Sequence, residues 1–77
     1  MEDLLKRITI DPTICHGKPT VRGLRYSADF ILDLCSSGMS SEIILTDYPD
    51  LEFDDLRAVF AYAARLCQTK RFETDVV

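Results

Sequence analysis

The chain lacks any apolar run long enough to cross a membrane. No stretch of its 77 residues approaches the roughly 20 consecutive apolar residues that a spanning helix needs. The first ten residues, MEDLLKRITI, mix acids with bases and lack the apolar centre of a secretory signal. We therefore expect a cytoplasmic protein that has no contact with a membrane.

Cysteine and histidine are scarce, and their spacing suits neither disulfides nor metal. Cys15, Cys35 and Cys67 form no CxxC pair, which argues against a disulfide framework and a structural zinc site. Cys35 and Cys67 lie in apolar helical patterns, where a free cysteine behaves as a small hydrophobe, so we expect both to be buried. The only histidine, His16, is adjacent to Cys15, and neighbouring residues seldom present both side chains to one reacting atom. The sequence therefore predicts no catalytic residue, no metal, no cofactor and no enzyme activity.

The chain is long enough for one small domain. A domain of this size buries only about 60% of the surface that its unfolded chain exposes, so its stability is marginal. Domains this small commonly gain stability from a partner subunit, a metal or a disulfide. Within the one domain we expect an extended arm or short β hairpin over residues 1–26, a three-helix unit over 27–72 and a frayed tail over 73–77.

The arm contains two short segments with the pattern of β-strands. Ile8-Thr9-Ile10 alternates β-branched residues and ends at the turn signal Asp11-Pro12. Thr20-Val21-Arg22 is a second β-prone segment, between Pro19 and Gly23. Because two strands alone are barely stable in water, we expect this hairpin to pack on the helices or on a partner chain.

A helical period begins after Ser27, which can cap the first helix, and Gly38 supplies the left-handed residue that ends it. Ser40 can cap a short second helix, which must end before Pro49. A third and longest helix follows, from about residue 53 to 69. This order of helices is typical of the helix-turn-helix layout. The expected fold class is therefore mainly α, a three-helix domain with an N-terminal β hairpin or arm.

The third helix has two faces of different character. Apolar residues recur at i, i+3, i+4 and i+7, which predicts a core stripe of Leu56, Val59, Phe60, Ala63, Leu66 and Cys67. Small residues on another face would let a second helix approach closely, and Tyr and Arg are frequent interface residues. The candidate residues for a dimer or partner interface, here and on the first helix, are Ala58, Ala61, Tyr62, Arg65, Phe30 and Leu34. The alternative is a solvent-exposed face in which alanine serves helix propensity alone.

Charge is unevenly distributed along the chain. Residues 1–25 contain five bases and three acids, whereas residues 26–77 contain four bases and ten acids. Basic arms of this kind follow DNA backbones or enter a minor groove. The candidate DNA-binding residues are Lys18, Arg22 and Arg25, joined by Lys6 and Arg7. The alternative is a solvated basic rim that pairs with acids such as Asp29 or Asp33.

Several of these segments, taken together, resemble the bacterial family called domain of unknown function 433. Its motif runs from Ile-x-x-Asp-Pro through Gly-Lys-Pro and Arg-Gly-x-Arg to Gly-x-Ser and Tyr-Pro-x-Leu. The matching residues are Ile8, Asp11, Pro12, Gly17, Lys18, Pro19, Arg22, Gly23, Arg25, Gly38, Ser40, Tyr48, Pro49 and Leu51. Leu24 stands where the family usually has threonine, and Glu52 stands where Ser or Thr normally caps the third helix, so we expect a weaker cap there.

The resemblance implies a homeodomain-like fold and a frequent genetic partnership with a PIN-like ribonuclease toxin. The expected function is therefore that of an antitoxin, a homodimer that binds the toxin and can also bind its own operator DNA. The acidic helical part would cover a basic RNA-binding surface of the toxin, while the basic arm meets DNA. The alternative function is a helical dimer that binds another protein and never contacts DNA.

Overall fold

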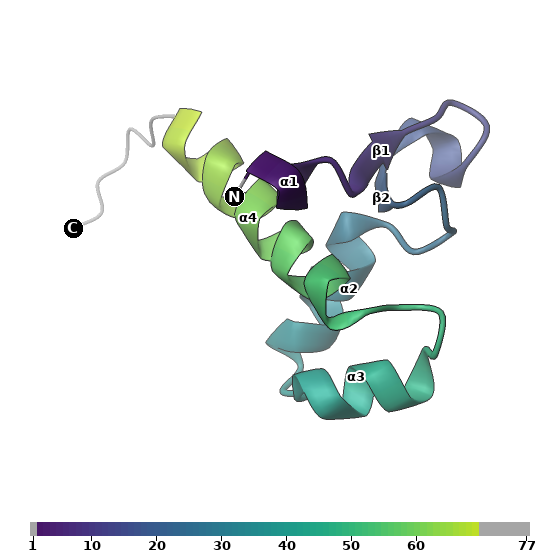
Figure 1. The fold of residues 1–77 in the computed structure, drawn as a ribbon, viewed down its shortest axis with the longest axis vertical. Coiled ribbons are helices and arrows are strands. Elements are labelled where there is room, and N and C mark those ends of the chain that lie inside the picture. The colour runs from purple at the N-terminus through teal and green to yellow at the C-terminus, as the bar shows by residue number, and fades with distance from the viewer. Residues whose placement is uncertain (1, 70–77) are drawn as a thin grey trace.

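The computed structural model describes residues 2–69. A small antiparallel hairpin lies in the N-terminal third of the chain, and three longer helices follow it (Figure 1). The elements are α1 (Glu2–Leu5), β1 (Ile8–Ile10), the 3₁₀ turn η1 (Cys15–Gly17), β2 (Pro19–Val21), α2 (Ala28–Ser36), α3 (Ser41–Asp47) and α4 (Phe53–Thr69). The predicted fold class is confirmed: the domain is mainly α, with three principal helices and an N-terminal β hairpin. Within the described residues, no helix is long and apolar enough to span a membrane.

The hairpin pairs β1 with β2 in antiparallel register, with Ile8 opposite Val21 and Thr9 opposite Thr20. Val21 and Thr20 are fully buried, because β2 packs against both α2 and α4. This packing supplies the support that a two-stranded hairpin needs. The loop between the strands contains η1, in which Cys15 and His16 adopt left-handed backbone conformations with φ of 51° and 57°.

Local signals set the ends of the helices as predicted. Ser27 Oγ accepts the backbone N–H of Phe30 at 3.2 Å, and Ser40 Oγ accepts that of Ile43 at 3.2 Å. Gly38, just after α2, has a φ of 99°, a conformation that side chains other than glycine's rarely allow. The expected frayed tail and the bases Lys70 and Arg71 lie outside the described residues.

The core lies where the hairpin and the three longer helices meet. Its buried apolar residues are Val21, Ala28, Ile31, Ile44, Leu51, Leu56 and Val59. A trio of aromatic rings borders it, in which Tyr48 lies edge-on to both Tyr26 and Phe30 with ring centroids 5.6 Å apart. Since Tyr48 follows α3 and Phe30 lies in α2, this trio joins the two helices.

The apolar stripe predicted along α4 is buried in its first half only. Leu56 and Val59 are 1% and 0% exposed, as predicted. Phe60 and Leu66 are each 48% exposed, and Cys67 is exposed too, so the predicted core positions of these three are wrong. The physical reason is visible in Figure 1, where the end of α4 extends away from α2 and α3.

The prediction that Ala58 lies on an outer interface face is also wrong, because Ala58 is 0% exposed. Helix α1, which the sequence pattern did not indicate, packs against α4. Leu5 of α1 lies beside Ala61 and Arg65, and Ala58 is one turn earlier on that side of α4. A helix of four residues is too short for apolar periodicity to reveal it.

Candidate interaction surfaces

Two basic side chains of the arm converge on one buried acid at the start of α4. The carboxylate of Asp55 is 0% exposed. Arg22 donates to it through Nε at 2.9 Å and through Nη2 at 2.8 Å, and Arg7 donates through Nη1 at 2.9 Å. The backbone N–H of Glu52 donates to the same carboxylate at 2.8 Å. We call Asp55, its two arginines and Glu52 the Asp55 clamp.

The hairpin itself brings the two arginines together. Arg7 precedes β1 and Arg22 follows β2, so they lie at the open end of the hairpin, where the N–H of Arg22 donates to the carbonyl of Arg7 at 2.7 Å. Arg22 has a left-handed φ of 49°, and its side chain also donates to the carbonyl of Asp50 at 2.9 Å. Arg7 donates in addition to Glu52 Oε1 at 2.8 Å. The clamp therefore ties the base of the arm to the start of α4.

The electrostatics of the clamp favour the charged forms of Asp55, Arg7 and Arg22. Burial raises the pKa of Asp55, but hydrogen bonds from Arg22, the Glu52 N–H and Arg7 outweigh this and hold its pKa below the ordinary value. Hydrogen bonds to Glu52 and Asp55 raise the pKa of Arg7, and the bond to Asp55 raises that of Arg22. Asp55 is therefore a fully satisfied buried carboxylate, with no capacity left for an external ligand.

The clamp also contributes to the start of α4, where the side chain of Glu52 pairs with Arg7. The side chain of Asp55 accepts the N–H of Glu52 three residues earlier, which is one half of a capping box. The spacing Glu52-x-x-Asp55 is a signal for this bond, and it was available in the sequence. Nothing in the sequence indicated that Arg7 and Arg22 would share the same acid.

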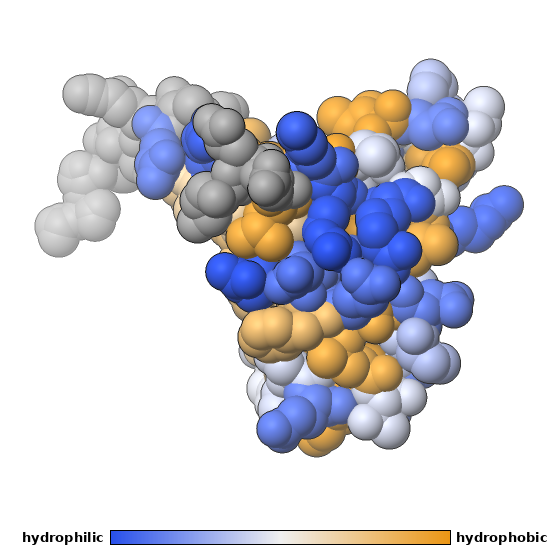
Figure 2. Space-filling model, viewed as in Figure 1, coloured by the Kyte–Doolittle hydropathy of each residue, from blue (hydrophilic) through white to orange (hydrophobic). Residues whose placement is uncertain are grey.

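The five predicted DNA-binding residues fall into three groups. Arg7 and Arg22 belong to the clamp. Lys18 forms an ion pair with Asp29 at 3.2 Å, which is the rim pairing that we gave as the alternative. Lys6 and Arg25 are exposed and form no ion pair with the side chains of residues 4–68, which are the ones that the structure describes. Figure 2 shows the side of the molecule that faces the viewer in Figure 1. Hydrophilic side chains form a band across its middle, with apolar patches beside the band.

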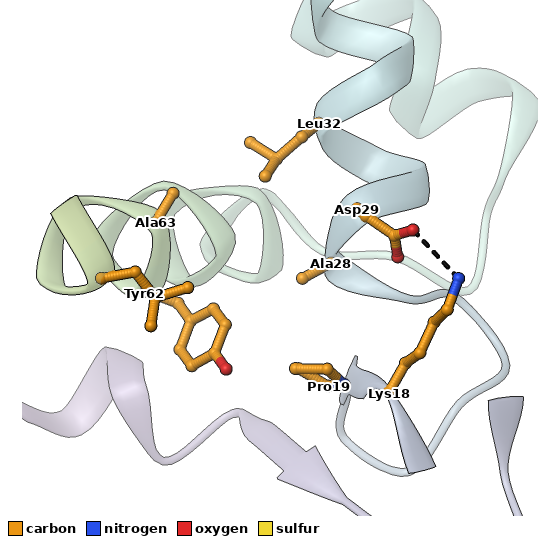
Figure 3. A pocket seen from close by; sticks show the side chains of 8 residues that line it. Lys18, Pro19, Ala28, Asp29, Leu32, Tyr62 and Ala63 are labelled. Carbon is orange, nitrogen blue, oxygen red and sulfur yellow. Dashed lines mark hydrogen bonds and ion pairs between the residues drawn. The ribbon is translucent and has the colours of Figure 1, made fainter. Parts of the chain in front are cut away.

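An apolar groove of about 320 Å³ opens between β2, α2 and α4. Figure 3 shows Ala28 and Leu32 of α2 on one side, Tyr62 and Ala63 of α4 on another, and Pro19 below. Leu66 completes the lining, and the ion pair of Lys18 with Asp29 lies at the rim. The groove therefore offers apolar contact area with one charged edge.

The predicted interface residues do not form one surface. Tyr62 lines the apolar groove, whereas Ala61 and Arg65 lie in a separate hollow beside α1. Phe30 and Leu34 are half-buried and pack against the edge of the core. Of the predicted set, Tyr62 is the residue that the structure brings to the groove.

Cys15 and His16 lie in η1, in the loop that connects β1 and β2. Cys15 Sγ lies 3.5 Å from the carbonyl of Arg25, to which it can donate. Among the residues that the structure describes, no group of three or more His, Cys, Asp or Glu side chains is placed to hold a metal ion.

The fold and its clamp define a small helical domain that carries a tethered N-terminal β arm. A family model described as "Protein of unknown function (DUF433)" matches residues 8–63, and the chain belongs to that family. It is similar to a DUF433 member from Anabaena variabilis, known from a crystal structure, with 26% identity and a TM-score of 0.74. The similarity covers 83% of this chain and 63% of that one, so the chain spans less than two thirds of its relative's length. No curated protein matches the chain.

Proposed function

We propose that the chain is a non-catalytic binding protein, the antitoxin-like partner of a PIN-like ribonuclease in a bacterial cytoplasm. The observation that carries this proposal is the amount of large apolar surface left exposed on so small a domain. Ile10, Ile43 and Phe53 are 64%, 51% and 55% exposed, in the arm, in α3 and at the start of α4. Exposed apolar surface of this kind marks sites of protein contact.

Charge favours a basic partner. The bases of residues 26–77 number four against ten acids, and opposite potentials favour association and select partners. A ribonuclease needs a basic surface to hold RNA. An acidic helical body that covers this surface would block the RNA from its site, as an antitoxin must.

A direct test is to co-express the chain with a PIN-like ribonuclease encoded beside its gene. We expect relief of the ribonuclease's growth arrest, loss of RNA cleavage in vitro and a complex of fixed stoichiometry. The variants Phe53→Glu and Ile43→Glu should weaken the complex. Gln68→Glu, which adds the same negative charge at another exposed site, should not. A ribonuclease that stays fully active and elutes apart from the chain would overturn the proposal.

Operator binding is a separable part of the proposal, and Lys6 and Arg25 are the residues that favour it. Phosphate contacts need exposed cations, and these two are exposed and outside the ion pairs described above. Arg7, Arg22 and Lys18 are already paired with acids of the same chain. These pairings favour the alternative, a helical module that binds protein and not DNA.

A gel-shift assay with DNA from upstream of the gene distinguishes a chain that binds its operator from a module that binds protein and not DNA. If the chain binds DNA through the arm, the double variant Lys6→Ala, Arg25→Ala should bind more weakly at equal salt. Its slope of log affinity against log salt should fall by about 2, roughly one for each lost phosphate contact. Arg57→Ala, which removes a base from the exposed side of α4, is the control. If the wild-type chain does not bind the DNA at low salt, operator binding is overturned and the result favours the alternative, a helical module that binds protein and not DNA.

A further inference from the structure

The hairpin has one strand edge that no other strand covers. Within the described residues the sheet consists of β1 and β2 alone, and Figure 1 shows β2 between β1 and α2. The outer edge of β2 is occupied by the segment that follows it, because Thr20 forms a bridge with Ser27. The N–H of Val21 also donates to the carbonyl of Tyr26, at 3.3 Å. The open edge of this sheet is therefore the outer edge of β1.

The pairing of the hairpin fixes which main-chain groups of β1 face the open edge. The N–H of Arg22 donates to the carbonyl of Arg7 at 2.7 Å, so these two residues form a hydrogen-bonded pair. Bonded and non-bonded pairs alternate along an antiparallel ladder. Ile8 and Ile10 are therefore in non-bonded pairs, and their N–H and C=O groups point away from β2. Among the residues that the structure describes, no backbone group outside the hairpin bonds to them.

We propose that the open edge of β1 pairs with the same edge of a second copy of the chain. An unpaired strand edge is a site at which another strand adds. The two β1 strands would run antiparallel, with a two-fold axis at Thr9. In this register Ile8 of each copy lies opposite Ile10 of the other, and the two residues exchange both of their main-chain hydrogen bonds. This contact is separate from the proposed ribonuclease contact, which is tested at Ile43 and Phe53 on α3 and α4.

The side chains of β1 suit this register. Ile10 is 64% exposed, whereas Ile8 is half-buried and packs against the core. Because side chains alternate along a strand, Ile8 and Ile10 lie on the same face of the hairpin. A two-fold axis perpendicular to the sheet keeps that face on one side of the joined sheet. Each Ile10 then lies beside Ile8 of the other copy instead of in water, and cross-strand pairs of this kind stabilise a sheet.

Charge favours the antiparallel direction. Lys6 precedes β1, is exposed and forms no ion pair with the described side chains of residues 4–68. Asp11 follows β1, and its Oδ1 accepts both the N–H and the hydroxyl of Thr13, at 2.9 and 2.7 Å. These bonds leave Oδ2 of Asp11 for a cation. Antiparallel strands bring the Lys6 end of each β1 towards the Asp11 end of the other, whereas parallel strands would place like charges side by side.

A single open edge limits the assembly to two chains. Once the β1 edges are joined, the outer edges of the sheet belong to the two β2 strands, and each is occupied by its own chain. A surface that pairs with itself about a two-fold axis forms a closed dimer. Since β1 is only three residues long, we expect a small interface that forms at high micromolar concentration.

Water exchange of the backbone amides, measured by NMR on the 77-residue chain at rising concentration, tests the pairing. The amides of Ile8 and Ile10 should exchange about tenfold more slowly once the dimer predominates, because a bonded N–H exchanges only when the pair opens. Thr9 is already in a bonded pair with Thr20, so its exchange should change much less. Sedimentation equilibrium should show dimers, and no larger species, over the same concentrations.

Two results would overturn the proposal. One is a chain that stays monomeric up to millimolar concentration with unchanged exchange at Ile8 and Ile10. The other is slowed exchange of these two amides only after a ribonuclease is added, because this would assign the open edge to that partner and not to a second copy.

The variant Ile10→Pro tests the main-chain bonds themselves. It removes an outward N–H but no bond of the hairpin, because Ile10 lies opposite Pro19 in a non-bonded pair. Proline is tolerated at an edge position whose N–H faces outward, so the circular dichroism spectrum should stay that of the wild type. The control, Ile10→Ala, shortens the side chain but keeps the N–H. The dimer dissociation constant of Ile10→Pro should exceed that of the control by about tenfold. Equal dissociation constants would contradict pairing through the main chain.

Discussion

The two halves of α4 carry the same apolar spacing but have different surroundings. In the first half, Asp55, Leu56 and Val59 are at most 1% exposed, held by the hairpin, the core and two arginines. In the second half, Phe60 and Leu66 are 48% exposed. The comparison shows that an amphipathic pattern predicts which residues can form an apolar face but not how far along the helix that face is buried. The first half of α4 is part of the core, whereas the second half leaves apolar surface exposed.

The largest effect should come from the clamp. Asp55→Ala removes the buried acceptor that Arg7 and Arg22 share, together with the acceptor of the Glu52 N–H, so we expect a loss of about 4 kcal/mol in the free energy of unfolding. Urea unfolding followed by circular dichroism measures it. Asp54→Ala, at the exposed neighbouring acid, should cost about 0.5 kcal/mol. Equal losses in the two variants would show that the clamp does not hold the arm.

A second test compares the two halves directly by truncating one apolar residue in each. Leu56→Ala should cost about 3 kcal/mol, because it leaves a cavity in the core. Phe60→Ala should cost less than about 1 kcal/mol, since its ring is already half solvated. Urea unfolding at low protein concentration measures both. Similar costs would mean that the second half is packed within the monomer, contrary to our account.

Acid should weaken the clamp specifically. The pKa of Asp55 in the folded chain lies below its ordinary value of 3.8. The carboxylate therefore stabilises the fold above 3.8, and this contribution is lost as the pH falls from 3.8 through the lowered folded pKa. Urea midpoints measured from neutral pH downwards should fall over that range. Asp55→Asn should show a shallower fall than Asp54→Asn, and parallel curves for these two variants would remove the clamp as the cause.

The smallest effect should come from the ion pair at the groove rim. Lys18 and Asp29 are 56% and 61% exposed, and exposed pairs contribute little after solvent screening. Lys18→Met should therefore change the free energy of unfolding by less than about 0.5 kcal/mol, and less still in high salt. A change as large as that of Asp55→Ala would show that the two kinds of pair do not differ as proposed.

The parts of the fold that sequence predicted are the parts that local chemistry decides. Ser27 and Ser40 cap α2 and α3 because a hydroxyl can reach an N–H three residues on. Gly38 ends α2 because its backbone adopts a φ of 99°. The hairpin followed from β-branched residues on both sides of a turn. The two serine caps and the glycine depend on no distant part of the chain, whereas the hairpin also needs its packing against α2 and α4.

The features that sequence did not predict depend on contacts between distant residues. Arg7 and Asp55 are 48 positions apart, and Arg22 and Asp55 are 33 apart, so their charges alone could not show that they pair. A cluster of bases in the sequence predicts a phosphate-binding surface until the structure shows that acids of the same chain pair with these bases. The packing of α1 against α4 likewise joins distant parts of the chain. The sequence therefore identified the charged residues but not the residues that they contact in the fold.

The central claim, that the core and the Asp55 clamp hold the first half of α4 while the second half lies outside them, is tested most directly by hydrogen exchange. Amides of residues 56–59 should be well protected in the wild type and should lose protection in Asp55→Ala, whereas amides of residues 65–68 should exchange quickly in both chains. Equal protection along the whole of α4, or an Asp55→Ala variant that exchanges as the wild type does, would contradict the account.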